Sequence, residues 1–416
     1  MARATGSGPP ACAKCGACST VCPVYRQTGR EYHTGRGKLH LLARLDPANA
    51  SAAYAEILSH CLLCGACSQV CTRAIPVAER LAAARAELHR RAGKQVLLRA
   101  LGGKLLGQPR LLRVLAPLAR IVKERRLPAD SGLNLRLGLN LAPAGPGETA
   151  PSTTRESGPD PVAGPATLYL FSGCYANFIE PEIPQAVCSL LAKNGLGRAR
   201  PATGGGCCGL AAYSSGQAGQ ARRLARKNIA AHPGSAPIVV ACASCASHLR
   251  RYGELLADDP DWRQPAADFA LRVREFSQYI YQANSQAPAA AAGEQPPLKV
   301  LYHDPCHLRF GPLRVGAEPR RLLQRIPGLE LTELPRGPQC CGQGGLFHLA
   351  HPTSSAAILE QLTSDFRQSG AEVVTTACSG CLLHWQQARA DGQHQARVLH
   401  LAVLLDRLLP PLEQQP

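Results

Sequence analysis

The residues of this sequence best suited to chemistry are its cysteines. The chain has 416 residues and 19 cysteines, and 18 of these recur in spaced patterns. A thiolate is both a metal ligand and a redox group, and two thiols can form a disulfide. The count is odd, and the first residues lack the apolar core of a secretory signal. We therefore expect a reducing compartment in which these thiols bind metal rather than pair as disulfides.

The first two cysteine groups share one spacing. The first run has four cysteines followed by Pro23 and reads C-x-x-C-x-x-C-x-x-x-C-P. The second run repeats this spacing with Thr72 in place of the proline. This spacing is typical of bacterial ferredoxins, in which three thiolates of a run bind one [4Fe-4S] cluster and the fourth binds the other. Zinc is an alternative, but duplicated runs of this kind are not its usual spacing. The sequence predicts one cluster on Cys12, Cys15, Cys18 and Cys71, and another on Cys61, Cys64, Cys67 and Cys22.

Two later segments carry a different cysteine pattern, which also occurs twice. Each begins with an apolar run that ends in a cysteine, continues to a glycine-flanked cysteine pair, and closes with a second apolar run before C-x-x-C. Five thiols exceed a tetrahedral site, so the spacing alone allows an iron-sulfur centre, a zinc site with a spare thiol, or redox-active thiols. We call the two sets the first repeat site, Cys174, Cys207, Cys208, Cys242 and Cys245, and the second repeat site, Cys306, Cys340, Cys341, Cys378 and Cys381.

The elements that position these cysteines follow from the hydrophobic pattern. Apolar runs that alternate with helical stretches predict an α/β fold with a parallel sheet in each repeat. In such sheets ligands lie beyond the carboxyl ends of the strands, where the apolar runs place their cysteines. We therefore expect each set of five to converge. Two related domains further predict a pseudo-twofold pair whose cysteine sets face each other or a shared cleft.

Composition divides the chain into domains. Residues 142–166 and 285–297 are rich in Ala, Pro and Gly, lack a hydrophobic pattern, and are predicted linkers. They separate an α-helical two-cluster ferredoxin domain at 1–141 (the head), a first repeat domain at 167–284 and a second repeat domain at 298–409. Within the first two domains we expect helices near 37–45, 51–59, 77–91 and 183–192.

Positive charge is concentrated in the head. Residues 1–130 contain 21 Lys and Arg against 7 Asp and Glu, so they hold most of the net charge of +17. The stretch 94–127 has leucines at helical spacing with basic residues between them, which fits a packing helix or a surface that docks on a partner or a membrane. No apolar run is long enough to span a membrane. We expect a cytoplasmic protein, with a peripheral contact at the inner face of the cell membrane as one use of the basic surface.

Several other residues near these patterns have simpler explanations. Cys188 matches no motif and is expected in the core. Nucleic acid is not an expected partner because there is no binding motif and aromatic residues make up only 5% of the chain. Five histidines near the repeat cysteines are expected to form hydrogen bonds or pack rather than bind metal: His248, His303, His307, His348 and His384.

The order of two ferredoxin motifs and two C, CCG, CxxC repeats resembles the iron-sulfur subunit of glycolate oxidase. Its relatives include D-lactate dehydrogenase iron-sulfur partners, the small subunit of anaerobic glycerol-3-phosphate dehydrogenase and the repeat-containing component of heterodisulfide reductase. The resemblance covers nearly the whole chain, and HDPCHLRFG, PRGPQCCGQGG and SGCLLHW are most similar to the glycolate and lactate branch. It implies one or two further clusters, noncubane or otherwise unusual in type, on the five cysteines of each repeat. Some members of that branch lack a repeat cysteine, whereas this chain keeps all ten.

The resemblance implies an electron-transfer subunit of an oxidoreductase. The sequence has no Walker loop, dinucleotide fingerprint or nucleophile elbow, so substrate chemistry is expected on a partner. The leading hypothesis is that the chain takes electrons from an FAD-containing dehydrogenase of glycolate or D-lactate and passes them to a quinone or another acceptor. The alternatives are disulfide reduction at the repeat sites, as in heterodisulfide reductase, and a zinc-stabilised scaffold.

Overall fold

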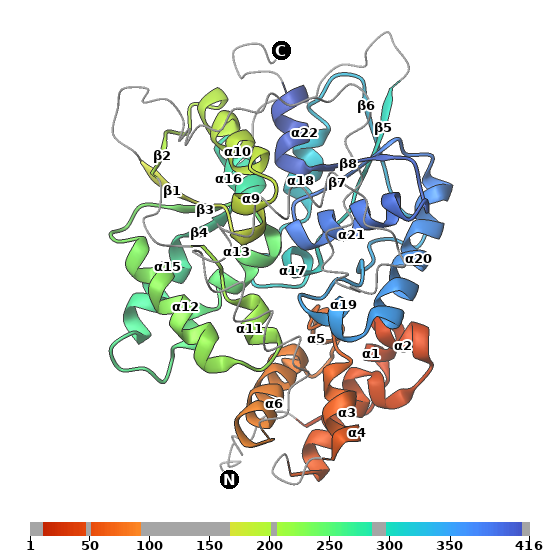
Figure 1. The fold of residues 1–416 in the computed structure, drawn as a ribbon. Helices are drawn as coiled ribbons and strands as arrows, with labels where there is room; N and C mark the ends of the chain where they lie inside the picture. The colour runs from red at the N-terminus through yellow and green to blue at the C-terminus, as the bar shows by residue number, and fades with distance from the viewer. Residues whose placement is uncertain (1–10, 47–50, 93–166, 201–205, 285–296, 410–416) are drawn as a thin grey trace, which may run out of the picture.

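A computed structural model describes residues 11–46, 51–92, 167–200, 206–284 and 297–409. The basic stretch 94–127 and the predicted linker 142–166 lie outside the described residues, as does the linker 285–297 apart from its last residue. The domain boundaries therefore stay predictions. Figure 1 shows a helical head below two α/β domains that lie side by side.

The head consists of short helices around a small apolar core. Ser51 and Thr34 cap two of these helices, because each side chain accepts a hydrogen bond from a backbone N–H of the first turn. Leu58 and Leu81 are buried in the core. The elements are α1 (Ala17–Val21), α2 (Pro23–Thr28), the 3-10 helix η1 (Glu31–His33), α3 (Gly35–Arg44), α4 (Ala52–Ser59), α5 (Ala66–Gln69) and α6 (Val77–Ala92).

The first repeat domain is a parallel four-stranded sheet in the order β2-β1-β3-β4, with helices packed on it. Its central strands β1 and β3 come from the predicted apolar runs and are largely buried. The elements are β1 (Leu168–Phe171), α9 (Cys174–Phe178), α10 (Glu182–Lys193), β2 (Ala199–Arg200), α11 (Leu210–Ser214), α12 (Ala218–Ala231), β3 (Ile238–Val240), α13 (Ala243–Leu249), α14 (Tyr252–Leu255), α15 (Arg263–Arg272), β4 (Val273–Glu275) and α16 (Phe276–Ala283).

The second repeat domain has the same topology, with the parallel order β6-β5-β7-β8. The long helix α20 begins with a proline in its first turn, and its C-cap is Gly370, whose φ of 67° suits a helix terminus. The elements are β5 (Leu298–Tyr302), α17 (Cys306–Arg309), α18 (Ala317–Leu323), β6 (Leu329–Thr332), α19 (Phe347–Ala350), α20 (Pro352–Ser369), β7 (Val373–Thr376), α21 (Ser379–Ala390), β8 (Arg397–His400) and α22 (Leu401–Leu408).

The two α/β domains form a pseudo-twofold pair. Helix α10 of the first domain packs on α22 of the second, and α18 of the second domain packs on α16 of the first. The first long helix of each domain thus packs on the last helix of the other. One continuous hydrophobic cluster runs through both sheets. The predicted α/β class and the repeated arrangement are confirmed.

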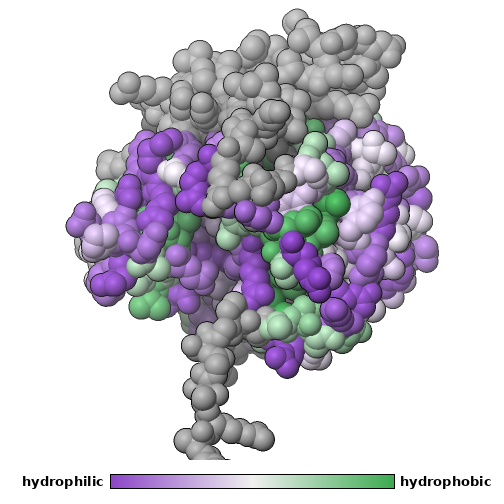
Figure 2. Space-filling model, turned by 90° about the horizontal axis from the view of Figure 1, so that it is seen from below, coloured by the Kyte–Doolittle hydropathy of each residue, from purple (hydrophilic) through white to green (hydrophobic). Residues whose placement is uncertain are grey.

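The described surface is mainly hydrophilic when the molecule is seen from the side of the head, with a smaller apolar area near its middle (Figure 2). Among the described residues, the exposed large apolar side chains are Leu45, Leu271 and Leu408. None of the described helices is both long and apolar enough to cross a membrane.

Candidate metal centres

The eight head cysteines line two neighbouring cavities. One contains Cys61, Cys64, Cys67 and, from the other run, Cys22. The second contains Cys12, Cys15, Cys18 and, again from the other run, Cys71. The fourth cysteine of each run thus lies with the first three of the other, as the ferredoxin spacing predicts, and Cys67 also borders the second cavity. The structure brings the predicted ligands together, and their binding of metal stays a prediction.

Local backbone geometry aims N–H groups at these sulfur atoms. Gly16 and Gly65 follow the second cysteine of each run with φ of 85° and 83°, a left-handed conformation that glycine adopts at little cost. The N–H of Lys14 lies 3.4 Å from Cys12 Sγ, and that of Arg36 donates to Cys18 Sγ over 3.2 Å. Such N–H groups stabilise an anionic cluster and tune its potential.

Two buried cations lie beside the head cysteines. Lys38 is 1% exposed, and its Nζ donates to the backbone oxygen of His33 over 2.5 Å. Burial lowers the pKa of Lys38, and the Cys61 and Cys22 thiolates act in the opposite direction. Arg85 is also buried, and one of its nitrogens donates to the backbone oxygen of Cys61 over 2.7 Å. A buried cation is costly without a negative partner, so this pocket fits an anionic cluster.

In each repeat domain, cysteines lie directly after the two central strands, at the same edge of the sheet. Cys174 begins α9 just after β1, and Cys242 follows β3 as the N-cap of α13. The order β2-β1-β3-β4 puts its switch point between these two strands, where ligands bind in open α/β sheets. Cys306 after β5 and Cys378 after β7 occupy the same places in the second domain.

The thiols within each repeat site form a connected series. In the first site the side-chain contacts run in the order Cys174, Cys207, Cys208, Cys245 and Cys242. In the second site they run in the order Cys306, Cys340, Cys341, Cys381 and Cys378. The two series meet, because Cys242 contacts Cys378 and its Sγ accepts the N–H of Ser379 over 3.4 Å.

Contacts with neighbouring thiols lower the pKa of three repeat cysteines, Cys208, Cys242 and Cys341. Contacts with Cys207 and Cys245 lower the pKa of Cys208 to about 6 despite burial. Contacts with Cys340 and Cys381 likewise hold the pKa of Cys341 well below its ordinary value. Thiolates are the form that binds metal, and five converging buried thiols form a donor set that fits an iron-sulfur centre.

Two family models match the chain in the regions just described. A "4Fe-4S dicluster domain" matches residues 10–75, and the CCG "Cysteine-rich domain" matches residues 168–250 and 300–386. The "Probable glycolate oxidase iron-sulfur subunit" of Bacillus subtilis (strain 168) is 28% identical over 418 residues, which cover 95% of this chain and 92% of the relative. "Lactate utilization protein A" of Bacillus velezensis is 30% identical over 237 residues, which cover 57% of this chain and 98% of the relative.

The chain belongs to the CCG-domain iron-sulfur oxidoreductase family. Membership of this family means that the chain carries iron-sulfur clusters and has a redox, electron-transfer role. The cysteines in the cavities and series described above are the residues of this CCG-domain protein that would hold those clusters.

The histidines near the CCG cysteines differ in their surroundings. His348 Nδ1 lies 3.0 Å from Gln343 Nε2, and His384 Nε2 lies 3.5 Å from Ser355 Oγ. His248 and His303 are buried, and neither has an oxygen or nitrogen hydrogen-bond partner for its ring nitrogens among the described residues. Burial lowers the pKa of His307. Cys188, expected in the core, is only partly buried on α10.

Sequence reasoning missed Lys38 and Arg85. Both lie in segments that contain many other basic residues, and nothing in their spacing distinguishes them. Their burial depends on how α3 and α6 pack around the cysteine loops.

Proposed function

We propose that this chain is the electron-transfer subunit of a flavoprotein 2-hydroxy-acid dehydrogenase, whose FAD-containing partner oxidises glycolate or D-lactate. The observation that carries this proposal is the unbroken succession of cysteine sets from the head through both repeat sites. The relatives supply the reaction class, since their names refer to glycolate oxidase and to lactate utilization. The glycolate oxidase relative aligns with nearly the whole chain, which favours glycolate.

The succession gives electrons an ordered route. Burial raises the pKa of Cys64 in the head, and the next largest effect comes from Cys306 of the second repeat site, so these two thiols are neighbours. At the other end of that site, Cys378 contacts Cys242 of the first repeat site. The proposed order of electron transfer is the first repeat site, the second repeat site, the head set with Cys64 and then the head set with Cys15.

The proposed cofactors are two [4Fe-4S] clusters in the head and a noncubane iron-sulfur cluster at each repeat site, with FAD on the partner. When bound, such clusters accept and release one electron at a time. The chain supplies the thiolates, backbone N–H groups that stabilise the reduced state, and an apolar core that keeps water from the buried sulfur atoms. We further propose a cytoplasmic location, with the basic head in peripheral contact with the membrane that holds a quinone acceptor.

The test is anaerobic purification of the full chain from its native cell. We expect an FAD-containing protein to copurify, and glycolate or D-lactate to bleach the clusters and reduce a quinone analogue. Cys64→Ser removes one step of the route, so flavin reduction should persist while quinone reduction is lost. Cys188→Ser, which lies outside every predicted set, serves as the matched control and should behave as the parent chain.

Two outcomes would refute the proposal. The first is a chain that purifies alone while the dehydrogenase reduces its acceptor normally. The second is an oxygen-free preparation that contains no inorganic sulfide.

A further inference from the structure

His303 is a buried polar side chain beside the second repeat site. It is 1% exposed, its ring nitrogens have no oxygen or nitrogen hydrogen-bond partner among the described residues, and it interacts with the Cys341 thiol. Buried polar atoms are nearly always paired, so an imidazole that has no oxygen or nitrogen partner and lies beside a thiol of the cysteine set points to the group that this set holds. A neutral imidazole nitrogen is also one of the commonest metal ligands in proteins.

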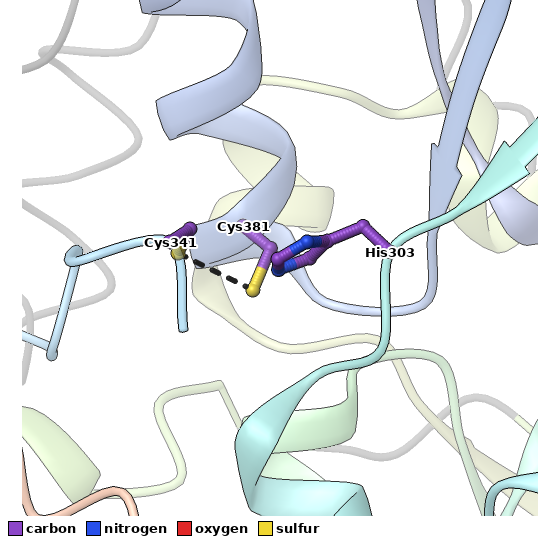
Figure 3. Close-up of side chains that lie close together, drawn as sticks. All are labelled: His303, Cys341 and Cys381. Atoms are coloured by element: carbon purple, nitrogen blue, oxygen red, sulfur yellow. Dashed lines mark hydrogen bonds between the residues drawn. The ribbon is translucent and has the colours of Figure 1, made fainter. Parts of the chain in front are cut away.

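The ring of His303 points at two thiols of the second repeat site. A ring nitrogen of His303 and the sulfur atoms of Cys341 and Cys381 all lie within 4.8 Å of one another. The two sulfur atoms are 3.6 Å apart, and Figure 3 shows the imidazole directed from the end of its strand toward them. Two thiolates on one tetrahedral metal lie roughly 3.7 Å apart when each metal–sulfur bond is about 2.3 Å. A single metal ion therefore fits among the three side chains.

The fold fixes this orientation. His303 follows the last residue of β5, and its N–H donates to the backbone oxygen of Thr375 in β7 over 2.8 Å. The ring packs edge-on against the buried Trp385, with ring centroids 5.6 Å apart. The imidazole is thus held in place by the sheet and by an aromatic neighbour.

Among the described residues, the corresponding position of the first repeat domain carries no imidazole. Phe171 precedes Cys174 by three residues, as His303 precedes Cys306, and it is the last residue of the corresponding strand β1. Its side chain is 3% exposed and carries no donor atom. The two sites therefore have the same pattern of five thiols but differ at this position by one imidazole.

We propose that His303 is a nitrogen ligand to iron in the centre of the second repeat site, which then has mixed thiolate and imidazole ligation, whereas the first site has thiolates alone. This inference rests on the proposed iron-sulfur centres. Imidazole is a neutral ligand, and centres with histidine ligands, such as Rieske centres, have higher potentials than those with thiolates alone. The second centre would then be the better electron acceptor of the two, which suits its position beside the head.

The test uses the full chain prepared anaerobically, labelled with ¹⁵N-histidine and ⁵⁷Fe, and compared with three variants. Pulsed EPR at stepwise potentials should show a directly coordinated ¹⁵N in the parent chain, and this coupling should be lost in His303→Gln and in His303→Phe. His384→Gln removes another imidazole beside Cys341 and should keep the coupling. Mössbauer spectra should show one iron subsite that changes in His303→Gln and not in His384→Gln, including when the centre is diamagnetic.

The outcomes separate this inference from the proposed function. Iron and sulfide in excess of the two head clusters, with no histidine-dependent coupling or Mössbauer subsite, would overturn the ligand while leaving the relay intact. A coupling that survives in His303→Gln would overturn it as well. If the parent chain holds no iron beyond the head clusters, the repeat centres themselves fail, and the inference fails with them.

Discussion

At the scale of single residues, the buried Lys38 is expected to set the potential of the head cluster on Cys22, Cys61, Cys64 and Cys67. Lys38→Met keeps most of the volume and removes the charge, so reduction of that cluster becomes less favourable. A unit charge about 6 Å away at an effective dielectric constant of about 20 is worth on the order of 100 mV. We expect the midpoint potential to fall by about this amount in an anaerobic EPR titration.

A matched control separates this effect from a general loss of positive charge. Arg44 is exposed on the same helix, and Arg44→Met should leave the potential unchanged because solvent screens that charge. Equal shifts in the two variants would contradict the role of Lys38.

The ligand candidates were predictable at this scale, whereas the groups that tune them were not. Cysteine spacing along the chain fixes which thiols can reach one cluster, so the grouping of Cys22 and Cys71 with the opposite runs followed from the sequence alone. The position of Lys38 depends instead on the packing of α3. The same holds for His303, which was expected to form hydrogen bonds or pack: its ring packs on Trp385, and its place beside Cys341 and Cys381 depends on the fold.

At the scale of elements, Glu275 caps α16 from a fully buried position. Its Oε2 accepts the N–H groups of Ser277 and Gln278 over 2.9 and 3.1 Å. Burial nevertheless raises the pKa of Glu275 from 4.5 to about 7. The folded protein therefore holds this proton more tightly than the unfolded chain does. The stability that Glu275 contributes is largest below pH 4.5 and is lost as the pH rises to about 7.

Glu275→Gln removes this titration and keeps an acceptor for the helix cap. Relative to the parent chain, the free energy of unfolding of the variant should rise by about 2 kcal/mol between about pH 5.5 and pH 8. Anaerobic urea denaturation across that range measures the difference. Glu254→Gln changes an exposed position on α14, and its free energy of unfolding should follow that of the parent chain across this pH range. The same behaviour in Glu275→Gln would contradict the prediction.

The sheets were predictable only in part. Long apolar runs identify β1, β3, β5 and β7, because a strand buried on both faces needs apolar residues throughout. The edge strands β2 and β4 have two and three residues, and they include Arg200 and Arg274. These segments become strands by pairing with β1 and β3, which the local sequence does not encode.

At the scale of the whole molecule, the head is tied to both α/β domains. Arg85 of α6 donates to backbone oxygens of the head and also to that of Ser214 in the first repeat domain. Gln27 of the head donates to Gln361 in α20 of the second over 2.8 Å. These contacts hold the head beside Cys306, so the proposed route depends on how all three domains are packed.

We expect each repeat domain to need its interface with the other domain in order to fold. Helices α10 and α16 pack on α22 and α18, Lys193 Nζ lies 2.8 Å from an Asp406 carboxylate oxygen, and the hydrophobic cluster is continuous across the pair. A chain that ends at Asn284 leaves α10 and α16 without these partners. Exposed apolar surface of this kind favours aggregation and loose packing.

We therefore expect residues 1–284 alone to lose cooperative unfolding and the metal of the first repeat site, although all five of its cysteines are present. Production of residues 1–284 together with 297–416 as two chains should restore both, because the missing helices are supplied in trans. Circular dichroism, size-exclusion chromatography and iron analysis under anaerobic conditions measure the two cases. A monomeric 1–284 fragment that unfolds cooperatively and retains the repeat-site iron would show that each repeat domain folds by itself, and that the pairing serves only to bring Cys242 beside Cys378.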